Sequence, residues 1–214
     1  AASCCLAGLP LPAVATPLPA PDTTAGYLAR LLVNEVPFPG ERGYRSEADT
    51  MAAIDQLALV LDRRLRQIPV PYQQQEIASV NASNLIDIIT AGGVKGQFDG
   101  FYRDASGRPA MVPRVTERVD RLIGIAGQGE PGRFARLLDY ANTVATRYVQ
   151  DQLDPPDRHA PVRVAQGQPA TGGSYAWMTD DMRFHPGGNF LRIGDQDQGA
   201  LGGNRFFTLR KDPK

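Results

Sequence analysis

The sequence is poor in the side chains on which several enzyme mechanisms depend. It has two cysteines, Cys4 and Cys5, and two histidines, His159 and His185, among its 214 residues. Neither histidine lies in an H-E-x-x-H segment or a similar spacing, so the sequence predicts no metal site, and it predicts no other cofactor. Ser174 is not part of a G-x-S-x-G turn, which argues against a serine hydrolase. Carboxylate chemistry remains.

The sequence also lacks an excess of either charge. Lys and Arg together number 23, Asp and Glu together number 23, and the formal net charge is +0. Nothing in this balance indicates a nucleic-acid partner. With 42% hydrophobic and 21% charged residues, the composition is that of a globular protein that can bury a sizeable core.

Both cysteines lie in an apolar stretch at the beginning of the sequence. This stretch ends in Ala13-Val14-Ala15 and resembles the apolar region and A-x-A cleavage site of a secretory signal. It is too short to span a bilayer, so we expect a secreted, periplasmic or cell-envelope protein without a transmembrane segment. The alternatives are a leader with no targeting role and a lipid anchor on Cys4. A proline-rich linker follows, so residues 1–22 are the leader and linker and residues 23–214 the predicted domain.

Helical spacing of apolar residues continues as far as about residue 150. Caps and breaks of Ser, Thr, Asn, Gly and Pro delimit the segments. The predicted helices span about residues 24–35, 46–67, 73–80, 85–90, 113–126 and 131–150. In the second and longest helix, we expect the face that carries Asp55, Asp62, Arg63 and Arg66 to be solvated.

The remaining segments are predicted to be irregular or extended. Residues 92–107 are rich in glycine and form a predicted loop, and residues 155–173 form a long surface excursion. Short extended pieces are expected at 172–177 and 206–209, where aromatic residues gather. The predicted fold class is therefore mainly α, with a small extended, β-containing C-terminal part.

The first helix ends at Glu35, which makes this residue the leading catalytic candidate. Packing against neighbours such as Leu32 and Phe38 would disfavour its charged form and raise its pKa. A carboxyl group that keeps its proton can donate it to a glycosidic oxygen. The alternative is a helix-end residue without a catalytic role, either solvated or paired with Arg30 or Arg42.

Several short motifs resemble one family. Asn34-Glu35 is followed by Pro39-Gly40, then by a long helix that carries Leu59–Arg64, and later by Gly96–Phe98. This order resembles the bacterial cell-wall hydrolases of the spore-cortex-lytic enzyme type. Asn204 stands where that family would have a histidine. The resemblance implies a lysozyme-like helical fold, with Glu35 as general acid/base cleaving peptidoglycan between N-acetylmuramic acid and N-acetylglucosamine.

Candidate substrate-binding residues follow from the same interpretation. Gln97 offers a side-chain amide for an N-acetyl group, and Phe98 offers a flat face for a sugar ring, although an isolated aromatic residue is more often core. We also place Tyr102 and Tyr175 in the groove and Trp177 in the core. Glu41, six residues after Glu35, is either a cleft residue or a loop charge.

Two mechanisms and one non-enzymatic alternative stay open. Without a fixed second carboxylate, the N-acetyl or 6-hydroxyl group of the sugar would trap the reactive centre, which makes a lytic transglycosylase. A positioned Asp99 would instead allow hydrolysis by a muramidase. The alternative is a secreted, catalytically inactive domain that binds peptidoglycan on the same scaffold.

Overall fold

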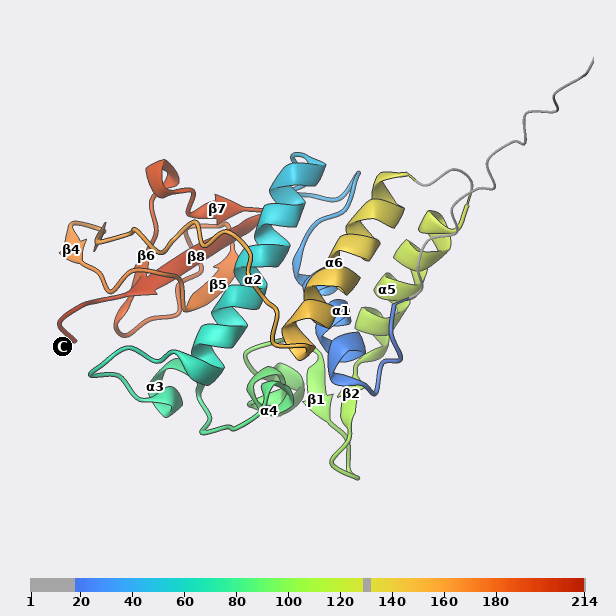
Figure 1. Cartoon of the computed structure of the whole chain (residues 1–214), viewed down its shortest axis with the longest axis horizontal. Coiled ribbons are helices and arrows are strands. Elements are labelled where there is room, and N and C mark those ends of the chain that lie inside the picture. The colour runs from blue at the N-terminus through green and yellow to red at the C-terminus, as the bar shows by residue number, and fades with distance from the viewer. Residues whose placement is uncertain (1–17, 129–131, 214) are drawn as a thin grey trace, which may run out of the picture.

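The computed structural model describes residues 18–128 and 132–213 (Figure 1). The predicted leader lies almost entirely outside these ranges. The chain is 41% helical with 14% strand, in small sheets, so the fold is mixed α and β. The expectation of a mainly α, lysozyme-like fold is therefore wrong. No helix in the described ranges is both long and apolar enough to cross a membrane.

The helices lie where the capping and spacing signals place them. They are α1 (Thr24–Glu35), α2 (Glu47–Arg66), α3 (Gln74–Ala78), α4 (Leu85–Thr90), α5 (Pro113–Ala126) and α6 (Arg133–Val149), with short 3-10 turns at Gly93–Lys95 and Asp195–Asp197. The hydroxyl of Thr23 accepts from the N–H of Gly26 (3.0 Å) and caps α1. Ser46 does the same for α2, accepting from Asp49 (3.1 Å).

The strands are short and were the least predictable part of the sequence. They are β1 (Phe101–Arg103), β2 (Pro109–Met111), β3 (Val164–Ala165), β4 (Gln168–Pro169), β5 (Ala176–Thr179), β6 (Phe190–Arg192), β7 (Ala200–Leu201) and β8 (Asn204–Leu209). The segments β1 and β2 form a hairpin where a glycine-rich loop was expected, and β3 and β4 form another. In the C-terminal sheet, β8 pairs antiparallel with β5, β6 and β7.

Helix α2 lies between the C-terminal sheet and the group of α1, α5 and α6 (Figure 1). Both sides of α2 are therefore covered, and the prediction of a solvated polar face is wrong for Asp55 and Arg63, which are buried. Asp55 accepts a hydrogen bond from the hydroxyl of Tyr140 on α6 (2.8 Å), and burial raises the pKa of its carboxyl. Arg63 forms an ion pair with Asp157.

The segment 155–173 is more than a surface excursion. It contains the β3–β4 hairpin and buries Val162, Ala165 and Ala170. His159 is 0% exposed, packs against Phe206 with ring centroids 5.3 Å apart, and places its Nε2 3.0 Å from the carbonyl of Gln198. The apolar residues between its prolines and glycines explain why the segment folds back onto the sheet.

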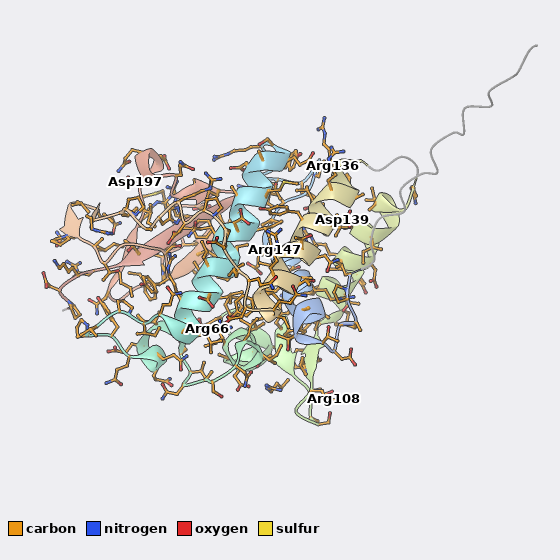
Figure 2. The ribbon with its side chains drawn as sticks, viewed as in Figure 1. Arg66, Arg108, Arg136, Asp139, Arg147 and Asp197 are labelled. Carbon is orange, nitrogen blue, oxygen red and sulfur yellow. The ribbon has the colours of Figure 1, made fainter. Side chains whose placement is uncertain are left out.

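Several exposed arginines have acidic partners. Figure 2 shows the labelled Arg66, Arg108, Arg136 and Asp197 spread widely across the view. Arg136, near the start of α6, contacts Glu47 at the start of α2 through Nε and Oε1 (2.6 Å). Ion pairs this exposed contribute little to stability, roughly 0–1 kcal/mol each.

A two-glycine turn joins β7 to β8 and docks the sheet on α2. Gly202 and Gly203 both have positive φ, +50° and +67°, as the tight turn of a two-residue hairpin requires. The N–H of Gly202 donates to Asp49 Oδ2 (3.0 Å). A Cβ at Gly202 would lie 2.5 Å from the Cβ of Ala53, so α2 and the turn are in close contact.

We predict that Gly202→Ala lowers the free energy of unfolding by about 3 kcal/mol. The positive φ at this position disfavours any residue with a Cβ, and the added methyl group would also clash with Ala53. Gly187 is the matched control, since it has a φ of +82° and a Cβ added there would have no atom within 4 Å. Gly187→Ala should cost only about 1 kcal/mol. Urea unfolding of both variants makes the comparison, and equal losses would contradict close docking of the turn.

Candidate active site

The last turn of α1 is fixed from two sides. This turn carries no basic residue of its own. Arg118 on α5 instead donates to the carbonyls of Val33 (2.7 Å) and Val36 (2.9 Å), which supplies positive charge and donors where the helix leaves carbonyls unpaired. On the other side, the amide of Asn204 donates to the backbone carbonyl of Glu35 (2.7 Å). Glu35 is thus held by α5 and β8.

The carboxyl group of Glu35 receives two hydrogen bonds. The indole Nε1 of Trp177 donates to Oε2 (2.9 Å), and the amide of Asn34 makes a longer contact with Oε1 (3.4 Å). Burial raises the pKa of Glu35 and outweighs these two bonds and the charge of Arg118, which lower it. This direction agrees with the raised pKa that the sequence predicts.

The alternative partners of Glu35 do not take that role. Arg30 donates Nη1 to the carbonyls of Pro19 (2.6 Å) and Gly26 (2.9 Å). Arg42 is exposed and shares a cleft with Glu35, but the two form no ion pair in the part of the chain that the structure describes. The carboxyl group therefore has no cation bound directly to it.

Glu35 opens into a cleft of about 210 Å³, which we call the acid cleft. Its lining residues are Asn34, Glu35, Val36, Pro37, Glu41, Arg42, Arg118, Thr179, Gly202, Gly203 and Asn204. Gly202 and Gly203 present backbone rather than side chains on this wall, so a ligand can approach the chain closely. The same glycine turn that docks the sheet thus shapes the cleft.

A second cavity of about 250 Å³, the aromatic cavity, adjoins Trp177. Its lining residues are Arg64, Glu76, Ile77, Ser79, Gln97, Phe98, Ala176, Trp177, Met178, Pro186 and Phe190. Trp177 lines this cavity and also donates to Glu35, which lines the acid cleft. Strand β5 borders both, with Met178 on the aromatic cavity and Thr179 on the acid cleft. The two hollows therefore meet at the Trp177–Glu35 pair.

Phe98 and Gln97 lie in the wall of the aromatic cavity. Phe98 is 3% exposed and stacks on Trp177, with ring centroids 5.1 Å apart, so it is both a core residue and a cavity residue. Gln97 uses both ends of its amide within the protein, accepting from Arg64 and donating to the carbonyl of Ala78. Gln97 therefore shapes the wall, and its amide is already committed to internal hydrogen bonds.

Two predicted groove residues lie elsewhere. Tyr102, on β1, pairs with Ala110 of β2 and lines neither hollow. Tyr175 is buried in a small cluster with Tyr72, Ile77 and Leu209. Trp177, expected in the core, is instead partly exposed and lines the cavity. The sequence alone does not predict that Trp177, rather than Tyr102 or Tyr175, lies beside Glu35, because 142 positions of the chain separate Trp177 from Glu35.

The two nearby acidic residues are both paired with arginines. Glu41 lines the acid cleft, where its Oε2 lies 2.5 Å from Nη2 of Arg118 and its Oε1 3.2 Å from Nη2 of Arg121. Its Oε2 also accepts from the N–H of Phe38 (2.8 Å). Asp99 is exposed and pairs with Arg114 at 2.5 Å. Glu41 is thus a cleft residue whose charge is offset, and Arg118 is the functional neighbour that the sequence did not reveal.

No protein-family model, curated protein or solved structure matches this chain. Within residues 18–128 and 132–213, no group of three or more His, Cys, Asp or Glu side chains is arranged to hold a metal ion. What the site offers chemically is a half-buried carboxyl group with a raised pKa, set between an open cleft and a cavity with an aromatic wall.

We predict that Glu35→Gln raises the free energy of unfolding at pH 8 by on the order of 1 kcal/mol, a common gain when a strained functional group is removed. A carboxyl group whose pKa is higher in the folded than in the unfolded protein lowers the free energy of unfolding as the pH rises above the unfolded-state pKa. The loss is complete once the pH exceeds the folded-state pKa. The gain should therefore vanish in acid, below the pKa of the unfolded state.

Glu41→Gln is the matched control in the same cleft. It leaves the guanidinium of Arg118 without its carboxylate, so the variant should lose about 2 kcal/mol. Denaturant unfolding at pH 8 and pH 4 measures both variants. Destabilisation by Glu35→Gln at pH 8 would contradict a carboxyl group whose pKa is raised in the folded protein.

Proposed function

We propose that this protein cleaves the glycan strands of peptidoglycan, with Glu35 as the general acid. The observation that carries the proposal is the carboxyl group of Glu35, held at the end of a buried helix with a raised pKa and facing an open cleft. A carboxylic acid that keeps its proton near neutral pH protonates the oxygen of a glycosidic bond as that bond breaks. This proton transfer makes the sugar oxygen a better leaving group.

The hydrogen bonds of Glu35 assign a role to each of its oxygens. Oε2 accepts from the indole of Trp177 at 2.9 Å, so it behaves as the carbonyl oxygen of the acid. Oε1 makes only the 3.4 Å contact with Asn34. In the protonated acid, the proton would therefore be on Oε1, the oxygen that can donate it to a substrate.

The shape of the site supports an extended sugar substrate. The acid cleft and the aromatic cavity lie on either side of the Trp177–Glu35 pair, so a strand that occupied both would place one bond beside the acid. Flat aromatic side chains offer apolar faces that suit the C–H face of a sugar ring. The resemblance of Asn34-Glu35 and Leu59–Arg64 to cell-wall hydrolases supports peptidoglycan as that strand.

The pairing of Glu41 favours transglycosylation over hydrolysis. A retaining hydrolase uses a second carboxylate as nucleophile, and an inverting one uses it to activate water. Glu41 is engaged by Arg118 and Arg121, and Asp99 by Arg114, so neither is a free base in the cleft. The N-acetyl group of the sugar can stabilise the cationic C1. The 6-hydroxyl then bonds to C1 and gives its proton to the Glu35 carboxylate, which has already protonated the leaving oxygen, and this lytic transglycosylase chemistry yields an anhydro product.

We predict that digestion of purified peptidoglycan releases soluble muropeptides with anhydro-muramic acid ends, detected by mass spectrometry. Glu35→Gln should lower the rate at least about 100-fold, the usual contribution of a general acid. Reducing ends instead of anhydro ends would identify a muramidase. If the wild-type protein binds peptidoglycan but releases nothing, the chain is the inactive binding domain and the proposal fails.

The pH dependence of activity gives a separate test. Activity should fall as the pH rises through the raised pKa of Glu35, since the acid then loses its proton. The hydrogen bond from Trp177 lowers this pKa, so Trp177→Phe should move the alkaline limb to higher pH. Asn34→Ala removes the longer of the two hydrogen bonds to the Glu35 carboxyl group and should move the alkaline limb by a smaller amount. An alkaline limb that stays in place in Trp177→Phe would contradict this assignment.

A further inference from the structure

Two neighbouring arginines on α2 are buried, but only one has a carboxylate. Arg63 forms an ion pair with Asp157 and donates to the carbonyl of Ser174 (3.3 Å). Arg64, 6% exposed, donates Nε to the carbonyl of Tyr175 (2.6 Å) and Nη1 to the amide oxygen of Gln97. In the described part of the chain, Arg64 forms no ion pair, and its Nη2 has no hydrogen-bond partner.

A buried guanidinium without an anion is unfavourable for folding. Burial removes the hydration of the ion, and this loss is unfavourable unless a partner of opposite charge offsets it. Burial lowers the pKa of Arg64 to about 10, and the group stays charged at neutral pH. The faces of Phe98 and Trp177, with centroids 5.7 and 5.8 Å from the guanidinium carbon, offset part of this cost but carry no net charge.

The uncompensated charge faces a hollow that is large enough for a ligand group. Arg64 lines the aromatic cavity of about 250 Å³, together with Phe98 and Trp177. Trp177 in turn donates to Glu35, so this cavity adjoins the acid. The free Nη2 can supply two N–H donors, and guanidinium N–H groups are the donors that carboxylates accept best.

We propose that the aromatic cavity binds a carboxylate of the substrate strand through Arg64. The inference rests on the proposed function, in which the substrate is peptidoglycan. Such a strand carries carboxylates from two sources: the lactyl group of a muramic acid without its peptide, and the stem peptide itself. An anionic group seated on Arg64 would place the neighbouring glycosidic bond toward Glu35. A neutral strand of N-acetylglucosamine lacks this contact.

A substitution on the rim of the aromatic cavity can test the role of the Arg64 charge without changing Arg64 itself. Ser79 lines the cavity, is exposed, and has a positive φ of 56°, which Asp and Asn tolerate better than most residues. Ser79→Asp adds a carboxylate beside Arg64, and Ser79→Asn adds the same shape without charge. Glu76, also on the rim, is occupied by the backbone N–H of Gln73 (2.7 Å).

The experiment is isothermal titration calorimetry on the full chain carrying Glu35→Gln, which prevents turnover. Three tetrasaccharides are compared: a muramyl strand without peptide, the same strand with stem peptides, and the neutral tetramer of N-acetylglucosamine. We expect at least one muramyl strand to bind about tenfold more tightly than the neutral tetramer. The strand that shows the preference identifies which carboxylate is bound. Adding Ser79→Asp should abolish the preference, and adding Ser79→Asn should keep it.

Equal affinities for the neutral and the charged strands would overturn the inference. A preference for charged strands that survives in both Ser79 variants would also overturn it. The same holds if the protein binds none of the three tetrasaccharides. These results are independent of the digestion of peptidoglycan, because binding is measured without turnover. If the wild type cleaves peptidoglycan but shows no preference for charged strands, the proposed function stands and the Arg64 site does not. If it prefers charged strands but does not cleave, the Arg64 site stands and the proposed function does not.

Discussion

The hydrogen bond from Trp177 to Glu35 joins the two parts of the molecule and defines its site. Glu35 ends a helix of the helical group, and Trp177 belongs to the C-terminal sheet on the other side of α2. The bond can form only if the sheet is placed correctly on α2. Arg64 provides that placement through the carbonyl of Tyr175, two residues before Trp177. The position of the acid thus depends on how the sheet packs.

The charges near the site follow a consistent pattern. Near the site, Arg63 is paired with Asp157 and Arg118 with Glu41. Glu35 and Arg64 form no ion pair with any described residue, and both contact the same indole ring, Glu35 through the ring Nε1 and Arg64 over the ring face. Leaving both without an ionic partner reduces stability. Such sites are common where activity has been favoured over stability, which is why these two groups carry the functional argument.

The helices could be predicted from the sequence, and so could extended segments that overlap β5 and β8, whereas the pairing of the strands could not. Caps at Thr23 and Ser46 and apolar spacing are local signals, and they placed α1 and α2 correctly. Strands of two to six residues give no comparable period, and their pairing joins residues far apart in the chain. Glu35 was recognisable as a candidate because it ends an apolar helix and is followed by two prolines. Trp177 was not, since only the packed sheet brings it to that carboxyl group.

Packing between residues far apart in the chain also explains why part of the polar face of α2 is buried. Asp55 and Arg63 look like surface residues in a helical pattern, but α6 and the sheet each cover one side of the helix. Their partners, Tyr140 and Asp157, come from later parts of the chain. A helix that is buried on two sides can therefore carry an amphipathic sequence when the neighbouring elements supply hydrogen bonds and opposite charge.

Burial of the Glu35 side chain raises the pKa of its carboxyl group, and the proposed chemistry depends on this shift. The most direct measurement is a carbon-13 NMR titration of its side-chain carboxyl group, assigned by the loss of its signal in Glu35→Gln. The account predicts a midpoint clearly above the ordinary glutamate value of about 4.3. A midpoint at or below that value would contradict it.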